Sequence, residues 1–268
     1  MEANPVRVIQ YFDGTKQNIV PLFQRPYTWE KSHWTNLWDD ILPQYDLGAV
    51  DSTHFMGAVV SVPARTVPVG VNKHLIIDGQ QRLTTIALLL CALRPFLNAQ
   101  SKGRVEDYLV NRHYDGPDRL KLMPTHGDRE PFSRLVLDEE LPPKGQKIRQ
   151  AIDFFSNCIN GQDLNGDPIN PDLLLQTIER CLQVVMINLG DADDPYLIFE
   201  SLNYKGEPLT QADLVRNYVL MRFKNSLGSG GEQEQVYFKL WKPIQESLAD
   251  SLTEFLRHYA MKEGEEVK

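Results

Sequence analysis

The residues best suited to chemistry in this sequence are the pentapeptide Asp78–Arg82, DGQQR, which lies between two apolar runs. The shorter run ends at Ile77 and predicts a buried strand, and the longer run begins at Leu83 and predicts a buried helix. Because a helix N-terminus carries unpaired N–H groups and partial positive charge, it attracts anions. The pentapeptide therefore predicts a turn that handles phosphate.

Each side chain of this turn suits a task at a phosphate. Asp78 is predicted to cap the helix, with Mg²⁺ binding or general-base action as alternatives. Gly79 lets the backbone approach a ligand closely. Gln80 and Gln81 could bind a base or sugar or orient a water, and Arg82 could hold a phosphate bidentately. A purely structural reading stays open, in which the arginine bridges to a neighbouring carboxylate.

A second polar and aromatic stretch, Phe23–Trp29 (FQRPYTW), precedes the first predicted helix. Arg25 could pair with phosphate, while Tyr27 or Trp29 could stack on a base or line an apolar pocket. The alternative places both rings in the core and pairs Arg25 with an acidic residue of the following helix. The stretch alone does not decide between them.

The elements expected to position these stretches are short strands and amphipathic helices. Two β-rich segments flank Asp13-Gly14 and predict a hairpin. Apolar runs predict further strands at residues 54–62, 73–78 and 182–189. Helical spacing predicts helices at residues 30–42, 83–93, 104–114, 129–138, 145–159, 171–182 and 214–223.

Three loops or helix starts carry polar residues of interest. Thr125–Glu130 (THGDRE) is predicted to be a polar loop, with a direct catalytic role as the alternative. Asn203 and Gly206 suit a turn with positive φ, which could close over a nucleotide or simply connect helices. Thr210 and Asp213 have the spacing of a capping box.

The composition restricts the function classes. With 28 basic and 36 acidic residues the formal charge is −8, so a general nucleic-acid binder is excluded and any DNA contact needs a local basic patch. Without a long apolar run or a signal peptide, the sequence predicts a cytoplasmic protein. Neither the cysteines nor the histidines have metal-ligand spacing, and the cysteines are predicted to be buried and unpaired: Cys91, Cys158 and Cys181.

Four motifs in this order resemble the N-terminal domain of the GmrSD-type family, whose signature is DGQQR and which includes SspE-like effectors that act on phosphorothioated DNA. The motifs lie at residues 20–42, 55–62, 75–93 and 196–220. The resemblance implies an α+β fold, with a ParB/sulfiredoxin-like small mixed sheet and a buried helix in residues 1–97. A mostly helical extension would follow in residues 98–225, and further helices in residues 226–268.

The resemblance also implies site residues. As catalytic residues it implies Asp78, Gln80, Gln81 and Arg82, with Asp78 also holding the metal. As nucleotide-binding residues it implies Gln24, Arg25, Gly79, Arg82, Thr84, Asn203 and Gly206. Sensing of the DNA modification falls to Arg25, Tyr27 and Trp29, because an apolar concavity beside a cation favours the less strongly hydrated sulfur of a phosphorothioate.

The function expected from this resemblance is that of a sensor domain in modification-dependent restriction and phage defence. It would bind modified DNA and hydrolyse a nucleoside triphosphate with Mg²⁺. In longer relatives a C-terminal nuclease does the cutting; none is recognisable here, which implies a chain ending before its nuclease or a stand-alone sensor with a separate partner. A module that binds modified DNA without hydrolysis and phosphoryl transfer to protein are the alternatives. A homo-oligomer is left open.

Overall fold

The computed structural model describes residues 2–22, 24–48, 53–64, 70–190, 193, 198, 210–223 and 232–262. The chain divides into two compact units. The first contains Met1–Pro21 and Arg25–Asp193, and the second contains Leu22–Gln24 and Asp194–Lys268.

The first unit is built on a six-stranded mixed sheet with the order β1-β6-β3-β4-β2-β5. Its strands are β1 (Glu2–Arg7), β2 (Lys16–Ile19), β3 (His54–Pro63), β4 (Asn72–Asp78), β5 (Leu122–Met123) and β6 (Leu182–Asn188). The pairs β1–β6 and β3–β4 are antiparallel, and β3–β6, β2–β4 and β2–β5 are parallel. This mixed sheet and its helices confirm the α+β class.

The predicted hairpin around Asp13-Gly14 is wrong. The strands on either side, β1 and β2, do not pair with each other: β1 pairs with β6, and β2 pairs with β4 and β5 on the other side of the sheet. Between them Val8–Tyr11 forms a 3-10 helix with three buried residues, which carries the chain across the core instead of reversing it. Burial of these apolar side chains outweighs the local turn signal.

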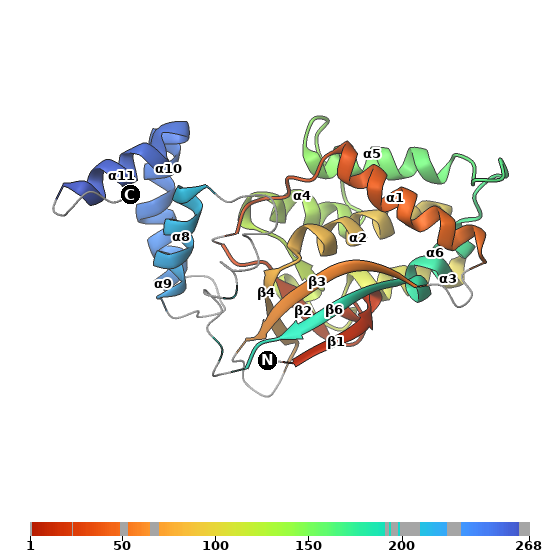
Figure 1. Cartoon of the computed structure of the whole chain (residues 1–268). Helices are drawn as coiled ribbons and strands as arrows, with labels where there is room; N and C mark the ends of the chain where they lie inside the picture. Colours follow the sequence, from red (N-terminus) through yellow and green to blue (C-terminus); the bar gives the residue numbers. More distant parts are fainter. Residues whose placement is uncertain are drawn as a thin grey trace. The chain divides into compact units, whose positions relative to one another are not determined.

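Among the described residues, six helices belong to the first unit: α1 (Lys31–Asp46), α2 (Gln80–Leu93), α3 (Ala99–Leu109), α4 (His126–Val136), α5 (Lys147–Ile159) and α6 (Pro171–Cys181). Helices α1, α2 and α5 lie on the same side of β3 and β6 (Figure 1). In α1 the predicted apolar face is confirmed, because Trp34, Leu37, Trp38 and Ile41 are all buried. Short 3-10 turns follow α2 at Arg94–Phe96 and precede β5 at Gly116–Arg119.

Helix α2 is the centre of this core. Its residues from Leu83 to Leu93 are all buried, as the apolar run predicts, and Arg82 is the one residue of the 14 that is not. A helix surrounded in this way is rigid, so its N-terminus is a firm base for a site.

The segment that follows residue 97 contributes to the same sheet. It supplies β5 and β6, and β6 lies between β1 and β3. The sequence places a boundary between a core and a helical extension near residue 97. The structure divides the chain into its two compact units after Asp193.

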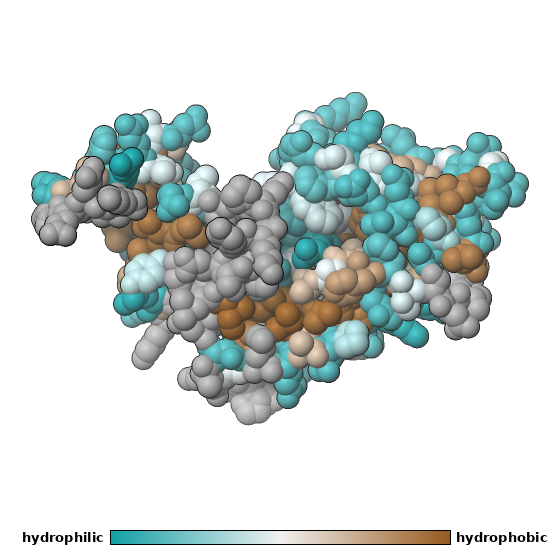
Figure 2. Space-filling view, viewed as in Figure 1, coloured by the Kyte–Doolittle hydropathy of each residue, from teal (hydrophilic) through white to brown (hydrophobic). Residues whose placement is uncertain are grey.

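The opposite face of the sheet is partly apolar. Leu182 and Val184 of β6 point into the core, so the pleat turns the half-buried Val185 and Ile187 to the other face. Figure 2 shows apolar residues gathered on this side, over β3 and β6.

The second unit is helical in the residues that are described. Its helices are α8 (Gln211–Met221), α9 (Glu232–Val236), α10 (Lys242–Leu248) and α11 (Leu252–Met261), with a π-helical turn at Tyr237–Trp241 and a 3-10 turn at Ala249–Ser251. The predicted capping box is confirmed, since Asp213 N–H donates to Thr210 Oγ1 and Thr210 N–H donates to Asp213 Oδ2. No helix within the described ranges combines the length and apolar character needed to cross a bilayer.

The cysteines follow their prediction in two of three cases. All three are unpaired, and Cys91 and Cys181 are buried, whereas Cys158 is half-buried. Burial raises the pKa of the Cys91 thiol to about 12, so this group is not a nucleophile at neutral pH.

Candidate functional site

The turn between β4 and α2 is made by Gly79. Its φ of +93° lies in the left-handed region, and a Cβ atom here would come within 2.8 Å of Val59 Cγ2 on the neighbouring strand. Only glycine fits both constraints. Gly79 is also the N-cap of α2, so the predicted cap at Asp78 is wrong: Asp78 is the last residue of β4, and no side chain of the N-cap accepts from the first turn.

Arg82 lies in the first turn of α2 with its guanidinium over the edge of β3. Its Nη1 donates to the carbonyl oxygen of Ala58 at 2.8 Å and lies 3.7 Å from Asp78 Oδ2. Gly57, with a φ of +105°, makes room for it, because a Cβ there would lie 3.1 Å from the guanidinium carbon. Both side chains of the Asp78–Arg82 pair are 31% exposed, so solvent and a ligand can reach them.

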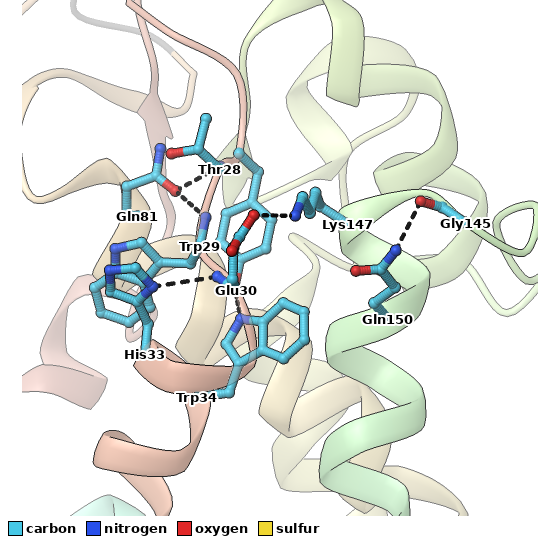
Figure 3. A network of polar contacts seen from close by, with 10 residues as sticks. Thr28, Trp29, Glu30, His33, Trp34, Gln81, Gly145, Lys147 and Gln150 are labelled. Atoms are coloured by element: carbon cyan, nitrogen blue, oxygen red, sulfur yellow. Dashed lines mark hydrogen bonds and ion pairs between the residues drawn. The ribbon is translucent and has the colours of Figure 1, made fainter.

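Residues Arg25–Trp29 are called the aromatic segment below. Both the oxygen and the nitrogen of the Gln81 side-chain amide form hydrogen bonds with the backbone of this segment. Its Nε2 donates to the carbonyl oxygen of Pro26 at 3.0 Å. Its Oε1 accepts from Thr28 N–H at 3.0 Å and from Trp29 N–H at 3.4 Å. Figure 3 shows the amide of Gln81 facing Thr28 and Trp29. The side chain therefore ties α2 to a segment more than 50 residues earlier in the chain.

Gln80 makes a related contact with one end of its amide. Its Nε2 donates to the carbonyl oxygen of Arg25 at 3.1 Å, so that bond leaves the oxygen end of the amide for other partners. Gln80 and Gln81 are each 8% exposed. Of the two, Gln80 is the better suited to orient a water molecule.

Tyr27 is a core residue whose hydroxyl joins three elements. It accepts from Trp34 Nε1 at 2.8 Å and lies 2.7 Å from Thr85 Oγ1, which in turn donates to the carbonyl oxygen of Gln81 at 2.8 Å. Burial raises the pKa of the Tyr27 hydroxyl far above its ordinary value, so it stays neutral. With 6% of its surface exposed, Tyr27 packs in the core, as the structural alternative for this ring has it.

Asp128 anchors the same segment from the other side. Its Oδ2 accepts from Tyr27 N–H at 2.6 Å and from Thr125 Oγ1 at 3.1 Å. Burial raises the pKa of this carboxyl group above its ordinary value, although both hydrogen bonds act in the opposite direction. The polar loop predicted at Thr125–Glu130 is wrong, because the first turn of α4 begins at His126.

Trp29 and Arg25 present side chains to solvent. Trp29 is half-buried and stacks on His33 with ring centroids 5.4 Å apart and planes 11° from parallel. Arg25 is half-buried as well, whereas Gln24 is buried and belongs to the second compact unit. Trp29 is thus the more accessible of the two rings predicted to sense a modification.

The remaining predicted positions fall into two groups. Thr84 of α2 is 3% exposed and is therefore buried in the protein interior. Asn203 and Gly206 lie outside the described residues.

A metal at this turn would rest on few protein ligands. Within the described ranges no three His, Cys, Asp or Glu residues are grouped to hold an ion. Mg²⁺ commonly takes one or two carboxylates and completes its shell with water and substrate phosphates. The carboxylate of Asp78 fits that pattern and does not fit a cage made by protein alone.

Three residues have contacts in this arrangement that the sequence reasoning did not predict. Thr85 stands in an apolar run four positions after Gln81, a spacing that could have suggested a shared helix face. Gly57 and Asp128 had no such signal, since their partners lie 25 and 101 positions away in the chain. Only the fold brings Gly57 to Arg82 and Asp128 to Tyr27.

The family of the chain follows from comparison with known proteins. Residues 8–220 match the family described as the GmrSD restriction endonuclease, N-terminal domain. No curated protein is significantly similar to the chain in sequence. Because the match covers more than half of the chain and includes the Asp78–Arg82 turn, this protein belongs to the GmrSD N-terminal domain family of restriction systems.

Proposed function

We propose that the chain is a nucleotide-hydrolysing sensor, which couples recognition of modified DNA to hydrolysis of a nucleoside triphosphate. The observation that carries the proposal is the Asp78–Arg82 pair, which is accessible at an N-terminus of α2 that no N-cap side chain covers. Membership of a restriction family makes modified DNA the expected signal.

The phosphates would bind at the first turn of α2. The backbone N–H groups and partial positive charge there favour an anion, and Arg82 adds a guanidinium fork. The 3.7 Å separation from Asp78 is long for a direct hydrogen bond, so the bond to the Ala58 carbonyl oxygen is the main contact that Arg82 would give up in turning to a phosphate. Asp78 would then hold Mg²⁺ together with phosphate oxygens.

The attacking water would be oriented by the oxygen of Gln80. Gln81 contributes by holding the aromatic segment in place, because both ends of its amide are occupied by backbone groups. Arg25 and Trp29, which are half-buried, would meet the DNA. Because the chain has a net charge of −8, non-specific attraction to the DNA phosphates cannot supply its affinity. A local contact made by one cation beside an aromatic ring would supply it instead.

Phosphate release tests this proposal. ATP, GTP, CTP and UTP are each supplied with Mg²⁺, with and without phosphorothioated DNA, to the native chain and to Asp78→Ala. We expect turnover of at least one nucleotide, a rise with modified DNA, and a loss of roughly 100-fold or more in the variant.

The control is Asp153→Ala. Asp153 forms an ion pair with Arg149 four positions away and is remote in sequence from the turn, so it matches the change in charge. Equal turnover in the native chain and Asp78→Ala would contradict the role of Asp78, and no turnover of any nucleotide would contradict hydrolysis.

A second candidate is a module that binds modified DNA and uses the nucleotide only as a switch. The engagement of Gln81 with backbone groups favours it, since that glutamine is then removed from the reacting water. Tight nucleotide binding and DNA discrimination without phosphate release would select this function.

A further inference from the structure

We propose that Gln81 is a positioning residue, which holds the aromatic segment in register on the first turn of α2. The DNA-reading side chains and the phosphate-handling turn would then respond to each other's ligand. This inference rests on the proposed function, and it assigns the coupling to one amide side chain.

The first argument is the saturation of the Gln81 amide. An amide oxygen accepts two hydrogen bonds, and that of Gln81 receives Thr28 N–H and Trp29 N–H. Its nitrogen donates to Pro26, on the same segment. A side chain that is 8% exposed and bonded in this way is built to bind backbone.

The second argument is that the aromatic segment has no secondary structure of its own. Residues 25–29 belong to no helix or strand, so their backbone groups need partners from elsewhere. Those partners are side chains: Gln80 for the carbonyl of Arg25, Gln81 for Pro26 and Thr28, and Asp128 for Tyr27 N–H. The conformation of the segment is therefore set by side chains of α2 and α4.

The third argument is adjacency in the sequence. Arg82, which would hold the phosphate, follows Gln81 directly on a rigid helix. A ligand that moves the backbone at Arg82 moves Gln81 with it, and the carbonyl oxygen of Gln81 is already linked through Thr85 to the hydroxyl of Tyr27. The helix turn and the segment are thus connected by both the side chain and the main chain of Gln81.

Hydrogen exchange of the Thr28 and Trp29 amides measures the contact directly in the full chain. Gln81→Met keeps the length of the side chain but removes its acceptor and donor, whereas Gln81→Glu keeps the acceptor and loses the donor. We expect exchange to become roughly three- to tenfold faster in Gln81→Met and to stay close to native in Gln81→Glu. Gln80→Met is the control, because its side chain contacts neither amide group.

The functional readout is the preference for phosphorothioated over unmodified DNA, measured by fluorescence anisotropy with and without nucleotide. We expect nucleotide to change this preference in the native chain and in Gln81→Glu, and to leave it unchanged in Gln81→Met. Native exchange rates in Gln81→Met would overturn the proposal. So would loss of hydrolysis in both Gln81 variants with native exchange, because Gln81 would then act on the reacting water.

The two proposals fail separately. A native chain that hydrolyses no nucleotide contradicts the proposed function, yet the exchange rates of the three variants still decide whether Gln81 holds the segment.

Discussion

The two ends of α2 each carry an arginine, and the two arginines have opposite surroundings. Arg82 at the N-terminus has a 31% exposed side chain, one carbonyl partner and a carboxylate 3.7 Å away. Arg94, just after the C-terminus, has an 8% exposed side chain. It donates to the carbonyl oxygens of Val136 and Leu135 at 2.7 and 3.1 Å, and to Asp138 at 3.0 Å.

This difference separates a structural arginine from one that can take a ligand. Arg94 donates to carbonyl groups in the last turn of α4, where a helix lacks backbone partners of its own for such groups. Arg82 keeps much of its hydrogen-bonding capacity at a helix end that attracts anions. One helix therefore holds the fold together at one end and carries the proposed phosphate site at the other.

The largest effect should come from Arg82→Ala on turnover. Loss of the guanidinium removes stabilisation of charge on the phosphates, and we expect hydrolysis to fall roughly 100- to 1000-fold. Because the residue is partly exposed, the free energy of unfolding should change by less than about 1 kcal/mol. Steady-state phosphate release and urea unfolding measure the two quantities. Unchanged turnover in Arg82→Ala would show that Arg82, like Arg94 at the other end of α2, takes no part in hydrolysis.

Arg94→Ala should show the reverse pattern. The variant removes the guanidinium donor from the carbonyl oxygens of Val136 and Leu135 and opens space in the core, so we expect about 2–4 kcal/mol less stability. Turnover per folded molecule should stay within about threefold of native below the unfolding transition. A fully stable Arg94→Ala would show that the C-terminal contacts are dispensable.

The smallest effect should be a pH dependence of stability, caused by Asp128, which holds the aromatic segment beside the N-terminal end of α2. Because its pKa is raised in the folded chain, its contribution to stability is full below the pKa of the unfolded chain and is lost as pH rises through the folded pKa. Asparagine does not titrate and keeps an oxygen for Tyr27 N–H. Relative to the native chain, Asp128→Asn should therefore gain stability as the pH rises from about 4 towards neutral.

Thermal unfolding of both proteins across this range measures the gain. A constant difference in stability over the whole range would show that Asp128 does not titrate differently in the folded and unfolded chains.

The sequence predicted the elements of this fold better than their pairing. Periodicity found α1, α2, β3, β4 and β6, because burial of one face leaves a local pattern. The hairpin failed because strand partners are chosen by the whole core, and β1 finds its partner some 180 positions later. The prediction of a loop at the start of α4 failed because THGDRE is polar and looks solvent-exposed in the sequence. In the structure its Asp128 accepts a hydrogen bond from the backbone of Tyr27, which lies far away in the chain.

The sequence predicted the turn between β4 and α2 but not the contacts that its side chains make. DGQQR marked the turn, and the special backbone of Gly79 follows from its residue type. The sequence could not show that Gln81 faces the aromatic segment and Arg82 faces β3, since both depend on which elements pack against α2. Asn203 and Gly206 stay predictions.

Nucleotide binding measured by isothermal titration tests the central claim most directly, namely that the N-terminal end of α2 is a phosphate site. Each triphosphate is titrated with Mg²⁺ into the native chain, Arg82→Ala and the control Arg149→Ala, whose arginine likewise bonds a carbonyl oxygen and a carboxylate four positions away. We predict that Arg82→Ala weakens binding at least about tenfold and that Arg149→Ala leaves it native. Native affinity in Arg82→Ala, or an equal loss in both variants, would contradict a phosphate site at this end of the helix.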